Sequence, residues 1–164
     1  MGLLVAGLVL GLTSCGPSSD QDPLRAPGDP IYSNASFDLS RLNGTWQQVA
    51  GFATGPGCAG GKATFARDAS GKTSGDARLC VAGRMQEWSG AVTRVGPGRF
   101  TIGGGEPWWV LWDDTDNRTL VIGTPSGAFG FVLDRNADLP ADRLAAAREI
   151  LDFNGYDLTT LKVD

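Results

Sequence analysis

Histidine is absent from this 164-residue sequence, and only three cysteines are present. Without histidine the chain has no imidazole general base, no serine–histidine–aspartate triad and no histidine-ligated zinc site. Three cysteines are too few for a four-thiolate metal site. Lys and Arg total 14 against 18 for Asp and Glu, and no basic cluster stands out. We therefore expect a protein that is not an enzyme, takes no metal or cofactor and does not bind nucleic acid.

The chain begins with a short hydrophobic run, residues 3–12, which is followed by small residues. A run of about ten residues is typical of a signal peptide and is too short to span a bilayer. The stretch Leu12–Cys15 resembles a bacterial lipobox, although no Lys or Arg precedes the run. That resemblance implies cleavage before Cys15 and attachment of acyl chains such as palmitate to this residue. With Gly16 rather than Asp next, it also implies an outer-membrane location on the periplasmic face. A buried apolar N-terminal segment is the alternative.

Cleavage at that point divides the chain into a signal peptide (1–14), a lipidated cysteine with a tether (15–40) and a folded domain (41–164). The tether is rich in Pro, Ser and Asp, as extended linkers are. If Cys15 carries lipid, Cys58 and Cys80 are the remaining thiols in an oxidising compartment, and we expect them to form a disulfide. Two buried free thiols are the alternative.

Turn-forming Gly, Pro and Asp residues recur at short intervals across the first part of the domain, about residues 42–135. Such spacing is typical of short antiparallel strands. It predicts eight of them, at 45–53, 61–66, 76–82, 86–95, 99–103, 107–113, 118–124 and 128–135. Closure into a barrel removes the unpaired edges of such a sheet. We therefore predict an all-β fold, an eight-stranded antiparallel up-and-down barrel.

The hydrophobic pattern changes from strand to helix spacing after the last of these strands. Between residues 140 and 154 the apolar positions Leu144, Ala147, Ile150 and Leu151 follow a helical period. Pro140 suits a first helical turn, and the Asn-Gly pair at 154–155 suits a C-terminal end. The sequence thus predicts one helix on the outside of the barrel, followed by a short ninth strand within residues 158–163.

Three motifs in this framework resemble the signatures of the lipocalins. Gly44-Thr45-Trp46 matches their G-x-W motif, and Arg135 matches the arginine at the end of their last barrel strand. The stretch 113–123 is similar to their second signature, with Asp116 in place of an aromatic residue, and the tail 154–163 is similar to that of bacterial outer-membrane lipocalins. The resemblance implies that Trp46 closes one end of the barrel beneath Arg135. It also implies a cavity that opens at the other end.

Strand alternation selects the residues that we expect to line this cavity, because side chains at i and i+2 share a face. The sixth strand, PWWVLW, leaves two sets open, and the resemblance favours Trp109 and Leu111 inward over Trp108, Val110 and Trp112. The alternative is that the inward side chains fill the barrel as ordinary core. The predicted lining comprises Phe129, Phe131, Leu133, Leu120, Ile122, Trp109, Leu111, Trp88 and Phe100.

The family resemblance implies that the protein binds, and stores or transports, a small hydrophobic or amphipathic ligand. A fatty acid or a lysophospholipid is the leading class, because the expected lipid anchor keeps the pocket close to a membrane. Two alternatives remain: a periplasmic protease inhibitor that inserts residues 16–36 into a protease, and an enzyme. The clustered carboxylates of Asp113, Asp114 and Asp116 fit a turn, with a cation site as the alternative.

Overall fold

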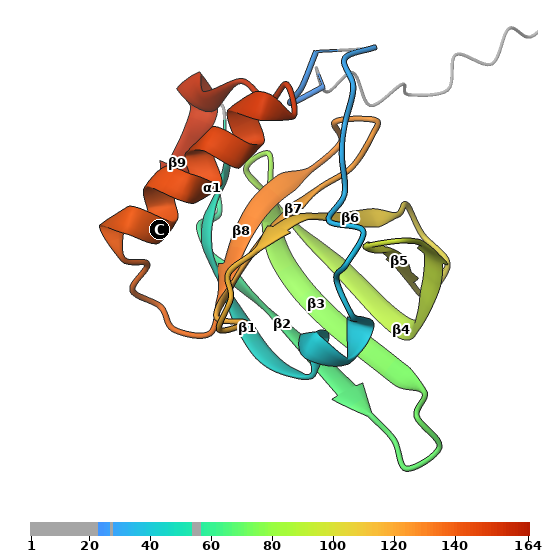
Figure 1. Cartoon of the computed structure of the whole chain (residues 1–164). Helices are drawn as coiled ribbons and strands as arrows, with labels where there is room; N and C mark the ends of the chain where they lie inside the picture. Colours follow the sequence, from blue (N-terminus) through green and yellow to red (C-terminus); the bar gives the residue numbers. More distant parts are fainter. Residues whose placement is uncertain (1–22, 27, 54–56) are drawn as a thin grey trace, which may run out of the picture.

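The computed structural model of the protein describes residues 23–26, 28–53 and 57–164 (Figure 1). The predicted signal peptide and Cys15 lie outside the described residues. Eight strands follow one another along the chain: β1 (Gly44–Phe52), β2 (Gly61–Arg67), β3 (Thr73–Val81), β4 (Arg84–Gly96), β5 (Arg99–Ile102), β6 (Trp108–Asp113), β7 (Thr119–Gly123) and β8 (Gly130–Asp134).

These strands close into a barrel because each pairs antiparallel with its neighbour and β1 pairs with both β2 and β8. The register of β1 with β8 shifts between Gln48 and Ala50. The pairing of β1 with β2 ends at Gln48. From Ala50 to Phe52, β1 pairs instead with a short strand, β9 (Leu161–Val163). The predicted eight-stranded antiparallel barrel with an additional ninth strand is therefore confirmed.

The buried side chains form two clusters, one on each side of the barrel wall. The inner cluster fills the barrel and takes alternate residues of the strands, such as Ala63, Phe65 and Ala77. The outer cluster takes the opposite face of β1, β7 and β8, with Val49, Val121 and Val132 among its members. Because both faces of these strands are buried, they read as continuous apolar runs rather than as an alternation.

The outer cluster is covered by one helix, α1 (Ala141–Phe153), which lies against the outside of the barrel (Figure 1). Ala147 and Leu151 are its buried residues, in agreement with the predicted helical face. The helix begins directly after Pro140 and ends before Asn154 and Gly155. Gly155 has a φ of +79°, a conformation that glycine adopts without strain. The predicted helix and its position are confirmed.

The segment before the barrel packs along the molecule. A short 3-10 helix, η1 (Leu39–Leu42), lies at the end of the barrel where β1 begins, and Phe37 and Leu42 are buried in the inner cluster. Further upstream the backbone N–H of Asn34 donates to the carbonyl of Val110, 2.7 Å away. Residues 28–40, the later part of the predicted tether, thus pack on the folded domain. In the described part of the chain, none of the helices combines the length and the apolar character needed to traverse a bilayer.

Candidate functional site

One end of the barrel is closed by Trp46 and the 3-10 helix η1. Trp46 is fully buried, and its indole N–H donates to the carbonyl of Leu42 at 2.7 Å. Cζ of Arg135 lies 3.5 Å from the centroid of the indole ring. The guanidinium also donates to the carbonyls of Thr45 and Arg41, at 3.2 and 2.9 Å. We call this end of the barrel, which Trp46, Arg135 and η1 cover, the closed end.

Gly44 explains why a glycine precedes the buried tryptophan. Its φ is +102°, and a Cβ atom at this position would lie 3.0 Å from Nη1 of Arg135. An L side chain there would strain the backbone and crowd the guanidinium. The G-x-W pattern therefore serves the contact between Arg135 and Trp46. Gly44 leaves room for the guanidinium, and Trp46 provides the ring on which it stacks. Burial lowers the pKa of Arg135.

The acidic turn between β6 and β7 lies at the same end and is held by arginines. Asp113 pairs with Arg41 at 2.6 Å, and Arg118 pairs with Asp114 and Asp116, each at 2.9 Å. Burial raises the pKa of Asp114, but hydrogen bonds from the backbone N–H groups of Thr119 and Arg118 outweigh it, so the pKa is lowered overall. These carboxylates therefore stabilise the turn through ion pairs and hydrogen bonds. Among the described residues no group of three His, Cys, Asp or Glu is placed to hold a metal ion.

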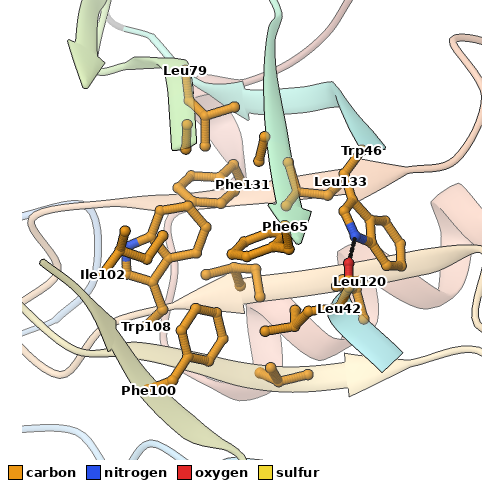
Figure 2. Packing of buried hydrophobic residues seen from close by; sticks show 14 of the residues in the cluster. Leu42, Trp46, Phe65, Leu79, Phe100, Ile102, Trp108, Leu120, Phe131 and Leu133 are labelled. Atoms are coloured by element: carbon orange, nitrogen blue, oxygen red, sulfur yellow. Dashed lines mark hydrogen bonds between the residues drawn. The ribbon is translucent and has the colours of Figure 1, made fainter. Parts of the chain in front are cut away.

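The interior away from the closed end is dominated by aromatic rings, which we call the aromatic cluster. Trp108 lies at its centre: its ring centroid is 5.3 Å from that of Trp88, 5.0 Å from that of Phe131 and 5.7 Å from that of Phe100. Figure 2 shows Trp108 and Phe100 on one side of the interior and Trp46 on the other. The aromatic cluster comprises Phe65, Trp88, Phe100, Trp108, Phe129 and Phe131.

Seven of the nine residues predicted to line the cavity belong to, or pack against, the inner cluster. Trp88 packs against it and is partly buried, whereas the other six are at most 2% exposed. Side chains occupy the space beside the small residues of the wall: a Cβ at Gly75 would lie 2.9 Å from the ring of Phe65. The six are Phe100, Leu120, Ile122, Phe129, Phe131 and Leu133.

The inward orientation predicted for Trp109 and Leu111 is wrong. In the β5–β6 register Trp108 pairs with the inward Phe100, so Trp109 faces outward, where Cζ of Arg99 lies 3.6 Å from the centroid of its ring. The register then shifts between Val110 and Trp112, and Leu111 joins the outer cluster. Trp108 and Val110 are the inward pair. Both faces of β6 are apolar. The sequence of this strand therefore lacks the alternation of polar and apolar residues that would indicate which face points inward.

Trp108 has a further property that the sequence does not reveal. The residue is fully buried, yet its Nε1 has no hydrogen-bond partner in the described part of the protein. Figure 2 shows this nitrogen on the side of the ring that faces Ile102, the last residue of β5. A buried donor without a partner costs about 1–3 kcal/mol. Trp108 is therefore a polar group placed inside an apolar interior, near the end opposite Trp46.

A second cluster of contacts at this opposite end involves Arg25, which sequence analysis did not single out. Arg25 is 4% exposed and donates to the carbonyls of Asn154, Pro125 and Asp29 at 3.0, 3.0 and 2.6 Å. The backbone N–H of Leu24 donates to the carbonyl of Gly127, 2.8 Å away. Residues 24–25 thereby fasten the N-terminal segment to the β7–β8 loop and to the end of α1.

The predicted disulfide between Cys58 and Cys80 is confirmed. It joins the loop after β1 to β3, across the region where β1 and β2 separate. Gln48 bridges the same gap, because its side-chain amide accepts from the backbone N–H of Cys80 and donates to its carbonyl, each at 2.7 Å. This side chain therefore replaces part of the missing strand pairing.

Comparison with known proteins agrees with this architecture. A family model described as a lipocalin-like domain matches residues 37–164. No curated protein sequence matches the chain. Among solved structures, the cockroach allergen Per a 4 superposes with a TM-score of 0.60 at 13% identity, covering 87% of this chain and 96% of the allergen.

Two further solved structures share the fold. Lobster apocrustacyanin A1 superposes with a TM-score of 0.58 at 14% identity, covering 85% of this chain and 89% of the crustacyanin chain. The siderocalin Ex-FABP gives 0.55 at 15% identity, covering 75% of this chain and 93% of that chain. With the family match over most of its length, the closed barrel and the Trp46–Arg135 contact, the chain belongs to the lipocalin-like domain family.

Proposed function

We propose that this protein binds a small hydrophobic or amphipathic molecule inside its barrel and stores or carries it at the outer membrane. In this proposal Cys15 carries the lipid anchor, and the ligand is a fatty acid or a lysophospholipid. Proteins built on the lipocalin fold are in general binding proteins for small hydrophobic molecules rather than enzymes. An apolar, concave interior with few polar groups is the usual form of such a site.

The aromatic cluster is the observation that carries the proposal. Its rings meet edge-on or tilted around Trp108, at the end of the barrel opposite Trp46. Because these rings already contact one another, a ligand enters only when some of them change rotamer. Trp88 is the member that solvent reaches, so its ring is the first to move. Rings displaced onto an apolar ligand keep their buried area, which limits the cost of opening.

Tryptophan emission tests the proposal, since the five tryptophans fall on two sides of the wall. Trp46, Trp88 and Trp108 contact the interior, whereas Trp109 and Trp112 pack with the outer cluster. A variant with Trp109→Phe and Trp112→Phe retains only inner reporters and should keep a saturable response to palmitate or lysophosphatidylcholine. Trp88→Phe in that background should reduce the response and leave the part that Trp108 contributes. A flat response of the wild-type protein to both lipids contradicts the proposal.

The structure gives less support to a protease inhibitor that inserts residues 16–36. In the described part of that segment, Leu24, Arg25 and Asn34 are bonded to the barrel or its loops. A segment fastened in this way is not free to extend into a protease cleft.

A further inference from the structure

The unpartnered N–H of Trp108 defines what kind of ligand suits the interior. The indole is fully buried, and no described group accepts from Nε1. The other fully buried indole, that of Trp46, donates to the carbonyl of Leu42. The two tryptophans therefore differ in their use of the same donor, and the donor that is left over lies in the aromatic cluster.

The side chains of the inner cluster pack around this donor, and they are apolar. The buried charged residues in the described part of the chain, Arg25, Asp114 and Asp134, are not members of this cluster and have partners elsewhere. Gln48, a polar residue that is 4% exposed, uses both ends of its amide on the backbone of Cys80. A carboxylate placed beside Trp108 would be a buried charge without a counter-charge, which is strongly unfavourable. A neutral acceptor would satisfy the N–H without that cost.

We infer that Trp108 Nε1 is the hydrogen-bond donor for a neutral acceptor on a hydrophobic ligand, such as the carbonyl of an acyl ester. This inference rests on the proposed function and sharpens it, because it favours acyl esters, the linkage found in lysophospholipids, over free fatty-acid anions. Trp88 controls access: its ring meets those of Trp108 and Phe129 at 5.3 and 5.9 Å, and it alone in the aromatic cluster is partly exposed. An acyl ester enters past this ring, and its polar end stays near the mouth.

Three probes of equal chain length separate these ligand classes: methyl decanoate, a neutral ester; decanoate at pH 8, an anion; and decane, which has no acceptor. We expect the full-length protein to bind methyl decanoate more tightly than the other two in calorimetric titrations. Replacing Trp108 with benzothienylalanine removes the N–H and keeps the shape of the ring. It should weaken methyl decanoate binding about five- to 100-fold and leave decane binding unchanged. The same replacement at the outward Trp109 serves as the control and should change neither.

Two further readouts test the donor itself. The ¹⁵N-labelled indole N–H signal of Trp108 should move downfield with methyl decanoate and not with decane. Because this N–H has no partner in the protein, its isosteric removal should leave the melting temperature unchanged or raise it. A lowered melting temperature would mean that the N–H already has a structural partner, and it would overturn the inference.

The outcomes also separate this inference from the proposed function. If all three probes bind and the replacement at Trp108 changes none of the affinities, the donor role is wrong while ligand binding stands. If decanoate binds more tightly than the ester, the preference for a neutral acceptor is wrong. If none of the probes binds to the wild-type protein, the inference and the proposed function both fail.

Discussion

Two fully buried tryptophans show how one residue type serves two purposes in this barrel. Trp46 is bonded through its N–H, stacked under Arg135 and covered by η1. Trp108 packs among the rings and aliphatic side chains of the inner cluster. Trp46 is therefore a structural residue that closes the barrel, whereas Trp108 retains a polar N–H group that no described residue uses. At the scale of single residues, hydrogen-bond satisfaction distinguishes structure from candidate function.

The contact between Arg135 and Trp46 should make a measurable contribution to stability. In a double-mutant cycle with Arg135→Lys and Trp46→Phe, we expect a coupling energy of about 0.5–2 kcal/mol from urea unfolding. Arg135→Lys alone should lower the free energy of unfolding by more than this coupling energy. A lysine cannot replace both hydrogen bonds, to the carbonyls of Thr45 and Arg41.

The outward stack of Arg99 on Trp109 provides a matched comparison. Trp109 is only partly buried, and water screens its contact with the guanidinium more effectively. A cycle with Arg99→Lys and Trp109→Phe should therefore give a smaller coupling energy. If the coupling energy between Arg99 and Trp109 is equal or larger, burial does not strengthen the contact between Arg135 and Trp46.

At the scale of elements, a buried ion pair fixes α1 to the barrel. Nη1 of Arg143 lies 2.5 Å from Oδ2 of Asp134 and 2.6 Å from Oγ1 of Thr119. The side chain of Asp134 is fully buried, and that of Arg143 is 11% exposed. The helix is therefore held at its first turns by a polar contact and further along by the packing of Ala147 and Leu151.

Arg143→Met should lower the free energy of unfolding by about 3–5 kcal/mol, because it leaves the carboxylate of Asp134 buried without a cation. Chemical denaturation monitored by circular dichroism measures this loss. Arg148→Met, an exposed change on the same helix, should shift the free energy by no more than about 0.5 kcal/mol. Similar effects for the two variants would show that the Asp134 pair contributes little.

The elements also show where sequence-based prediction succeeds. The turns and the change to a helical period locate the eight barrel strands and α1 to within a few residues, since turn chemistry and hydrophobic periodicity are local properties. The orientation of β6 was not predicted correctly, because Trp108, Val110 and Leu111 are all buried although they face different sides. The sequence does not predict the buried role of Arg25 either, because two of its acceptors, the carbonyls of Asn154 and Pro125, lie 129 and 100 residues away in the chain.

At the scale of the whole molecule, Tyr156 connects the barrel with the chain that follows α1. Its ring stacks on Phe52 with centroids 5.3 Å apart and lies where Gly130 leaves room, since a Cβ there would be 2.5 Å from Cε1. Its hydroxyl accepts from the backbone N–H of Thr124 and donates to the carbonyl of Phe129, at 2.8 and 2.9 Å. Burial raises the pKa of Tyr156 to about 12.

This raised pKa predicts a loss of stability at alkaline pH. The ordinary tyrosine pKa is about 10, so the unfolded chain releases this proton at lower pH than the folded protein does. The contribution is complete below pH 10 and is lost as the pH rises toward 12, by about 2–3 kcal/mol in total. Urea unfolding across this range measures the decline, and Tyr156→Phe should remove this part of it. If the variant shows the same decline, other groups are responsible.

The sequence by itself determined the order of the elements, the closed barrel, the disulfide and the identity of the plug at the closed end. Each of these follows from local turn chemistry, from the count of cysteines or from a short motif. Only the tertiary structure decided which face of β6 is inside and how residues 23–26 and 28–40 pack on the barrel. It also decided that the N–H of Trp108 has no acceptor among the described residues. These depend on the pairing of strands far apart in the chain and on which atoms meet inside the barrel, and neither is encoded in a local pattern.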